Sequence, residues 1–255
     1  MSGPIIRRYL SVSVILLSLG IASVAAKAQG GPPMITDDTG TIPTGHWEIN
    51  TAFTWERNAE GALYGIPLLD VNYGLSKNAQ LKIEIPWVVG HANGGRAIGG
   101  VGNTSIAIRW RFRDEREQHR IALSIYPAFE FNTSDASVRR RLVDKGPELL
   151  LPLQIQTQVG KYGINGDVGY RFKRGTNELI YGVVIGRTFK NRVDLLAEIH
   201  ATGPTARLRA SEVVYDLGSR IRMTRNTTLL VSAGRSLFNG RDLRFIGYLG
   251  IQTTF

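Results

Sequence analysis

The chain has 255 residues and carries 31 Lys and Arg against 21 Asp and Glu, for a formal net charge of +10. It contains no cysteine, which excludes disulfide-stapled domains, thiol nucleophiles and cysteine-ligated metal sites. Hydrophobic residues make up 43% of the chain, which excludes an intrinsically disordered protein. Only one apolar run approaches the length of a membrane-spanning helix, and it lies at the N-terminus. A bundle of transmembrane helices is therefore excluded as well.

Residues 1–28 have the three parts of a secretory signal peptide. Arg7 and Arg8 supply the positive charge, residues 9–24 form an apolar run, and Ala26-Lys27-Ala28 gives the small-x-small pattern of a cleavage site. We expect cleavage after Ala28, with a cut after Ala26 or an uncleaved membrane anchor as alternatives. Export of a cysteine-free chain fits the envelope of a Gram-negative bacterium.

Residues 29–44 are rich in Gly, Pro and Thr and predict an extended, irregular N-terminal segment. They include the adjacent carboxylates Asp37 and Asp38. Two neighbouring carboxylates are weak support for a calcium site, so no metal site is predicted here.

From Gly45 to Phe255 the apolar residues recur at every second position, which is the pattern of β-strands. In Thr104–Phe112, for example, Ile106, Ile108 and Trp110 alternate with small or basic residues. The pattern predicts about twelve strands, at 45–56, 64–74, 79–89, 102–112, 119–131, 148–158, 163–173, 178–188, 192–201, 212–223, 226–237 and 242–255.

These strands favour an all-β fold, a closed antiparallel transmembrane β-barrel over residues 45–255, rather than a soluble β-sandwich. One face of nearly every strand carries charged or amide side chains and the other is almost uniformly apolar. Aromatic residues gather near strand ends, where interfacial girdles lie. The connections tend to alternate between short and long, as the turns and loops of outer-membrane barrels do.

The last strand ends in Phe255, with Gly250 and Ile251 upstream. This arrangement resembles the C-terminal signal that the outer-membrane assembly machinery reads, although Thr253 stands where that signal usually has a hydrophobic residue. We therefore interpret Gly250 and Phe255 as an assembly signal.

Three motifs support a family resemblance. They are Pro32-Pro33-Met34-Ile35-Thr36-Asp37-Asp38 leading to Gly45-His46-Trp47-Glu48, then Tyr73-Gly74-Leu75-Ser76-Lys77-Asn78, then Gly100-Val101-Gly102-Asn103-Thr104. Together they resemble the bacterial outer-membrane barrels named for the meta-pathway of phenol degradation. The resemblance implies an outer-membrane transporter and the passage of aromatic compounds.

The residues of the polar face are the candidate functional residues, and both signs of charge occur among them. They either line a small aqueous pore as charge rings, which we favour, or pair across the lumen and close it. The lumen and selectivity candidates are Lys82, Glu84, Arg109, Arg111, Glu130, Asp167, Arg171, Asp194, Glu198, His200, Asp216, Arg220, Arg222 and Arg244.

No catalytic constellation is recognised in the sequence. None of the four histidines stands in a His-x-Ser arrangement. Asp194, Glu198 and His200 share one strand face, and we favour a hydrogen-bond network over a proton relay or metal site for them. We predict no catalytic residue, metal or cofactor, and no nucleic-acid partner, because no binding module accompanies the basic charge.

The main hypothesis is therefore a monomeric outer-membrane channel for passive diffusion of small solutes, with aromatic or anionic compounds as the candidates. The alternative is a non-conducting structural or surface-interaction barrel. Expected partners are the assembly machinery, outer-membrane lipid and lipopolysaccharide. Arg139-Arg140-Arg141 either bind lipopolysaccharide phosphates or other anions, or form a solvated charge run, and the sequence favours neither.

The signal peptide gives a first prediction. The mature protein should begin at Gln29 and fractionate with the outer membrane, which N-terminal sequencing of the purified fraction measures. A mature chain that retains residues 5–25, or recovery from the soluble periplasm, would contradict it.

Overall fold

The structure is a computed structural model that describes residues 30–115, 120–207, 210–237 and 244–255. The expected signal peptide, residues 1–28, lies outside the described residues.

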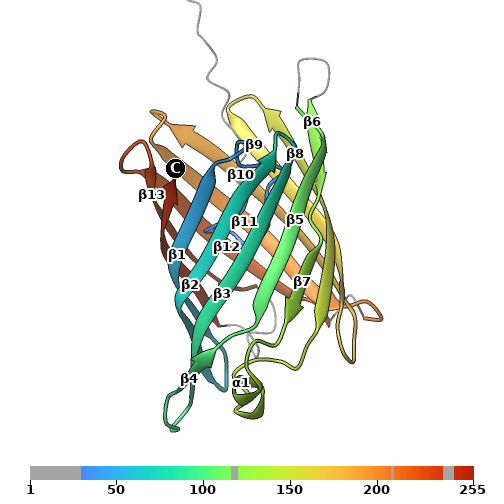
Figure 1. Ribbon diagram of the computed structural model, residues 1–255, viewed down its shortest axis with the longest axis vertical. Coiled ribbons are helices and arrows are strands. Elements are labelled where there is room, and N and C mark those ends of the chain that lie inside the picture. Colours follow the sequence, from blue (N-terminus) through green and yellow to red (C-terminus); the bar gives the residue numbers. More distant parts are fainter. Residues whose placement is uncertain (1–29, 116–119, 208–209, 238–243) are drawn as a thin grey trace, which may run out of the picture.

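The described strands form one antiparallel sheet that closes into a barrel (Figure 1). Twelve strand passages make the wall, and two extra strands arise from an added hairpin and a break. The all-β, closed antiparallel barrel expected from the sequence is thus confirmed. The strands are β1 (Trp47–Arg57), β2 (Gly61–Ser76), β3 (Ala79–Ala92), β4 (Ile98–Val101), β5 (Thr104–Arg113), β6 (Ile121–Ile125), β7 (Ala128–Phe131), β8 (Glu148–Val159), β9 (Tyr162–Phe172), β10 (Glu178–Phe189), β11 (Val193–Pro204), β12 (Glu212–Arg222), β13 (Thr227–Ser236) and β14 (Phe245–Thr254).

The structure departs from the expected strands in two places. The fifth expected strand is divided into β6 and β7 at Tyr126-Pro127, because proline has no N–H to donate to the ladder. Pairing is still bridged there, since Ile108 N donates to Pro127 O at 3.1 Å and Tyr126 N donates to Pro152 O at 3.2 Å. In addition, β4 folds back onto β3, opposite Trp87–Gly90.

A short helix, α1 (Asp135–Arg139), lies in the segment between β7 and β8 that the strand pattern left unassigned. Ser134 caps it, since its side chain accepts from Ser137 N. Among the described residues, no helix is long and apolar enough to cross a membrane.

The two faces of the wall differ in the way that the alternation predicts. Outward side chains are apolar and accessible; Ile108 is 50% exposed and Leu217 is 60% exposed. Inward side chains are polar and buried; Gln154 and Asn165 are both 0% exposed. This distribution is the reverse of that in a soluble domain, and it requires apolar surroundings.

Aromatic side chains gather at both ends of the wall. At the end where the chain terminates, the rings of Trp47 and Tyr73 lie 4.5 Å apart. At the opposite end, the rings of Trp55 and Phe245 lie 4.6 Å apart. Two such bands with aliphatic side chains between them match the interfacial girdles of a membrane barrel.

The two rims of the barrel also differ. Short turns at 77–78, 160–161, 190–192 and 223–226 lie at the rim that also holds the C-terminus, which we call the short-turn rim (Figure 1). The segment with α1 lies at the other end, the long-loop rim (Figure 1). Closure of the barrel is completed at the short-turn rim, where Trp47 N donates to Phe255 O at 2.8 Å and Phe255 N donates to Trp47 O at 3.0 Å. Gly250 lies opposite Ala52 in the same pairing.

The face assignment yields a prediction at Ile108, which points outward from the middle of β5. Replacing Ile108 with Arg should destabilise the membrane-inserted barrel by about 2–4 kcal/mol, the cost of a cationic side chain near the bilayer midplane. Reversible unfolding in lipid measures it.

The controls for this prediction are Ile108→Leu, which keeps the apolar surface, and Ala107→Ser on the inward face. Both should be nearly silent. An equal loss in Ala107→Ser and Ile108→Arg would mean that the two faces are assigned wrongly.

Candidate functional site

The interior of the barrel is the candidate site, and the strand register brings the expected residues to it. Every residue of the predicted lumen set except Arg244 lies within a strand, on its inward face. Pairs such as Asp194 opposite Arg220 and Glu198 opposite Asp216 show how neighbouring strands combine them. Arg244 instead lies just before β14 and is exposed.

Several of these charges pair along the wall. Lys82 Nζ lies 3.3 Å from Asp70 Oδ2 and 3.2 Å from Glu84 Oε2. The other pairs within the wall and its turns are Arg111 with Asp114, Arg171 with Glu148 and Glu178, Lys173 with Glu178, and Arg222 with Asp194. An ion pair contributes less to the electrostatic potential in the lumen than an unpaired charge does. The positive potential in the lumen is therefore weaker than the number of arginines implies.

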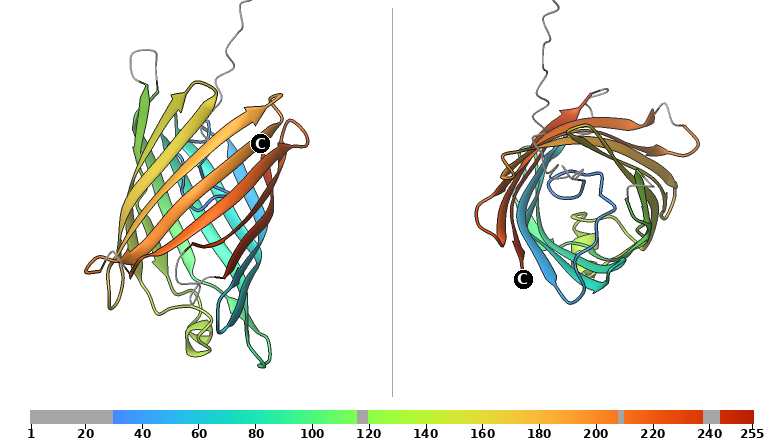
Figure 2. Two further views of the ribbon diagram at one scale, coloured as in Figure 1. Left: turned by 180° about the vertical axis from the view of Figure 1, so that it is seen from behind. Right: turned by 90° about the horizontal axis from the view of Figure 1, so that it is seen from above.

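The N-terminal segment lies inside the barrel. Residues 30–44, called the plug below, form turns without helix or strand and occupy the interior when the barrel is viewed along its axis (Figure 2). A tight loop starts the plug, since Gly31 N donates to Thr36 O at 2.8 Å and Met34 N donates to Gly31 O at 2.9 Å. The loop leaves backbone groups that the wall must satisfy.

Two wall residues hold this loop by its backbone. Arg220 donates from Nε to Pro32 O at 2.8 Å and from Nη2 to Gly31 O at 2.9 Å, and it also donates to Gly30 O. Glu198 accepts from Ile35 N at 2.9 Å and from Thr36 N at 2.5 Å. The cationic Arg220 thus donates to backbone carbonyls of the loop, and the carboxylate of Glu198 accepts from its backbone amides.

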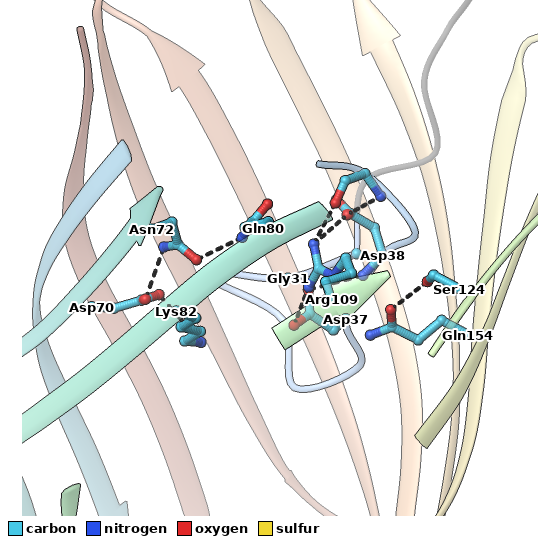
Figure 3. Close-up of polar contacts among 12 residues, drawn as sticks. Gly31, Asp37, Asp38, Asp70, Asn72, Gln80, Lys82, Arg109, Ser124 and Gln154 are labelled. Atoms are coloured by element: carbon cyan, nitrogen blue, oxygen red, sulfur yellow. Dashed lines mark hydrogen bonds and ion pairs between the residues drawn. The ribbon is translucent and has the colours of Figure 1, made fainter. Parts of the chain in front are cut away.

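A third anchor is an ion pair with both plug carboxylates. Arg109, itself 5% exposed, lies 2.6 Å from Asp37 Oδ2 and 3.2 Å from Asp38 Oδ1 (Figure 3). It also donates to Gly40 O at 2.6 Å, and its Cζ lies 4.2 Å from the centre of the Tyr126 ring. The carboxylates that the sequence offered weakly for calcium therefore bind a guanidinium.

The anchors also set the ionisation of the two plug carboxyls. Burial opposes the charge of Asp37, but Arg109 and Lys82 outweigh it and hold the pKa of Asp37 below its ordinary value. Burial raises the pKa of Asp38, against the opposing charge of Arg109.

Uncharged side chains complete the seat of the plug. Thr39 Oγ1 donates to Gln156 Oε1 at 2.7 Å, and Ile42 N donates to Gln80 Oε1 at 3.0 Å. Gln80 is itself held by Asn72, whose Oδ1 accepts from Gln80 Nε2 at 2.7 Å (Figure 3).

Inward-facing glycines make room for the plug. At Gly182 a Cβ would collide with Thr36 Oγ1, and at Gly218 it would stand 2.8 Å from Met34 Cε. Met34 also packs with Val184 and Leu196 in a small apolar cluster. The glycines and this cluster show that the wall is shaped to the plug.

Hollows remain in the interior, among the residues that the structure describes. One of about 210 Å³ lies between the plug and the wall, and its lining includes Lys82, Arg109, Arg222 and Tyr126. A larger one of about 680 Å³ opens at the long-loop rim and is lined by His91, Arg96 and Arg140–Arg141, among others. Beside it, Leu142 packs over Gly90 and Gly100.

The expected trio of Asp194, Glu198 and His200 does share the inward face of β11, but its members have different partners. Glu198 holds the plug, Asp194 binds Arg222 at 3.1 Å, and His200 lies buried opposite Gly182. Of the three residues, Glu198 has the hydrogen-bonding role that we favoured, because it accepts hydrogen bonds from the backbone of the plug. The predicted lumen set does not include Gln80, Gln156 and Ser232, which also contact the plug. The alternation indicates their inward positions but not these contacts.

Comparison with solved structures identifies similar barrels. An outer membrane channel from Pseudomonas putida F1 superposes with a TM-score of 0.63 at 13% identity, covering 86% of this chain and 98% of that chain. The KdgM porin in complex with disordered oligogalacturonate gives 0.56 at 14% identity, covering 82% and 99%. The NanC porin gives 0.56 at 9% identity, covering 81% and 98%. At these identities the likeness establishes the fold alone.

No protein-family model matches the chain, and comparison with curated protein sequences finds no match.

The anchors generate a prediction for Arg109→Gln. The change removes both ion pairs and the bond to Gly40, and a hydrogen bond to a charged group contributes about 1.5–3 kcal/mol. Hydrogen-exchange protection of residues 30–44 should therefore fall by roughly 10- to 100-fold.

The matched control is Arg171→Gln, because Arg171 pairs with Glu148 and Glu178 on the wall and not with the plug. Its plug protection should stay at the wild-type level. Unchanged protection in Arg109→Gln, or an equal fall in both variants, would show that Arg109 does not anchor the plug.

Proposed function

We propose that this protein is an outer-membrane channel through which small molecules diffuse passively. The observation that carries the proposal is the inverted barrel: the outside is apolar between two aromatic bands, and the inside is polar and buried. Such a chain is stable in a bilayer and offers a hydrophilic path across it. The similar structures are described as channels and porins, which favours transport over catalysis.

The resemblance to the meta-pathway barrels supports the same location and adds aromatic compounds as candidate solutes. The structure of KdgM with oligogalacturonate supports anionic solutes, because galacturonate carries a carboxylate. In this chain, Arg109, Arg220 and Arg222 line the inner hollow, and they would bind such a solute in exchange for their present partners in the plug and on the wall. Small organic anions are therefore the proposed solute class.

We place the short-turn rim on the periplasmic side, because outer-membrane barrels have short periplasmic turns and longer outer loops. Insertion would then depend on the assembly machinery through Gly250 and Phe255. The proposed unit is one barrel, since the β1–β14 pairing closes the sheet within one chain.

One observation favours the alternative of a non-conducting barrel. The plug lies in the lumen (Figure 2) and is held by Arg109, Arg220 and Glu198. A barrel closed in this way would serve as a scaffold or surface contact, so conductance has to decide between the two functions.

Conductance in planar bilayers is the test, and deletion of residues 30–40 is the informative variant. The wild-type barrel should show small conductance steps, and the deletion should enlarge them, because it removes the loop that occupies the lumen. Retained heat-modifiable migration shows that the variant still folds. Absence of steps in both proteins, with folding retained, would favour the non-conducting barrel.

Selectivity gives a further prediction. The wild-type channel should prefer anions weakly, because much of its lumen charge is paired, and deletion of residues 30–40 should strengthen the preference by removing Asp37 and Asp38 from Arg109. Reversal potentials in a salt gradient measure this. The preference should shrink near 1 M salt, where the Debye length is about 3 Å.

Adding Arg109→Gln to the deletion should move the reversal potential back towards cations. Arg225→Gln, on an exposed turn outside the lumen, is the control and should leave it unchanged. Clear cation preference in the deletion variant would show that lumen carboxylates control the pathway.

A further inference from the structure

The outward face of β10 carries one cation among apolar side chains. Val183 and Ile185 point outward and are 55% and 44% exposed. Arg187 follows them on the same face, since inward and outward positions alternate along β10. A lone guanidinium at the end of a lipid-facing stripe belongs at the level of the headgroups, because its charge is costly deeper in the bilayer.

Two exposed rings hold this guanidinium. Arg187 Cζ lies 4.8 Å from the centre of the Phe189 ring and 5.7 Å from that of Tyr162, on neighbouring β9. Tyr162 is 45% exposed and Phe189 is 40% exposed. The rings restrict where the guanidinium can lie.

The adjacent turns of the short-turn rim add more positive charge. Lys161 stands in the β9 turn, and Lys190 and Arg192 stand in the turn between β10 and β11; all three are exposed. Within the described part of the chain, no carboxylate lies within 4.0 Å of the charged nitrogens of these three residues or of Arg187. These four cations therefore have no carboxylate counter-ion among the described residues.

We propose that these residues, called the basic–aromatic patch (Lys161, Tyr162, Arg187, Phe189, Lys190 and Arg192), bind the headgroup phosphate of an anionic glycerophospholipid. The planar fork of Arg187 donates to the phosphate oxygens, and the lysines in the turns supply further charge. The acyl chains lie against the apolar outward side chains next to the patch, which include Ile185 on β10 and Leu195 on β11. Leu195 is the residue opposite Arg187 in the strand pairing.

The choice of a glycerophospholipid follows from the position of the patch. It lies on the short-turn rim, which the proposed function places at the periplasmic leaflet, and glycerophospholipids fill that leaflet. The other basic cluster, Arg139–Arg141, is at the long-loop rim, and Arg140 and Arg141 line the mouth of the barrel rather than its lipid-facing wall. Lipopolysaccharide phosphate is therefore the competing source at the opposite leaflet.

The test is lipid binding by the full-length barrel in detergent, followed by native mass spectrometry. The probes are phosphatidylglycerol, phosphatidylcholine with the same acyl chains, and lipid A. Wild-type protein should retain phosphatidylglycerol in preference to the other two. Arg187→Gln should weaken phosphatidylglycerol binding about fivefold, the effect expected for one cation at an anionic surface, and Arg187→Lys should restore part of it.

The matched control is Arg225→Gln, which removes one exposed cation from another turn of the same rim. It should change binding less than twofold, by roughly the diffuse contribution of a distant charge. Equal losses in Arg187→Gln and Arg225→Gln, no preference over phosphatidylcholine, or tighter binding of lipid A would overturn the proposal.

Failure of this proposal is separable from failure of the proposed function on which it rests. If the protein conducts in bilayers but shows no lipid preference, the lipid-binding proposal is wrong and the proposed channel function still holds. If Arg187→Gln does not fold, Tyr162→Leu takes its place. It removes one ring from the guanidinium and should lower phosphatidylglycerol binding in the same direction, and unchanged binding would count against the patch.

Discussion

A chain surrounded by hydrocarbon has to satisfy every backbone N–H and C=O group within itself, because lipid offers no hydrogen bonds. Closing the sheet between β1 and β14 meets this requirement, with Trp47 and Phe255 exchanging both hydrogen bonds at the seam. The closed wall then leaves each side chain two directions, outward to lipid or inward to the lumen. The period of two in the sequence is the direct consequence.

The same constraint reaches the interior. A barrel of this size encloses polar side chains that need partners, and the plug supplies many of them. Its backbone carbonyls accept from Arg220, its amides donate to Glu198, and its carboxylates pair with Arg109. The wall has glycines next to the plug, such as Gly182 and Gly218, where any larger residue would collide with it. Plug and wall are therefore one packed unit.

Much of the wall was predictable because strand alternation is a local, repeated signal. The alternation of residues around them predicts that Ile108 points outward and Arg109 inward, and the structure confirms both directions. The break at Tyr126-Pro127 does not follow from the alternation, although Pro127 is a local signal for it. The path of the plug had no comparable signal, since its anchors are single side chains far away in sequence; Glu198 and Thr36 are 162 residues apart. Such contacts arise from closure, which brings distant strands around one space.

The plug offers Arg109 and Arg220 the same ligands that an anion would offer, namely carboxylate and carbonyl oxygens. An anionic solute entering the inner hollow would therefore meet donors that already have partners, and its binding would have to exceed what the plug supplies. The hydrogen bonds that make the barrel a packed unit thus also oppose anion entry. For this reason the size of the lumen and its charge cannot be treated separately: removing the plug enlarges the path and frees its arginines in the same step.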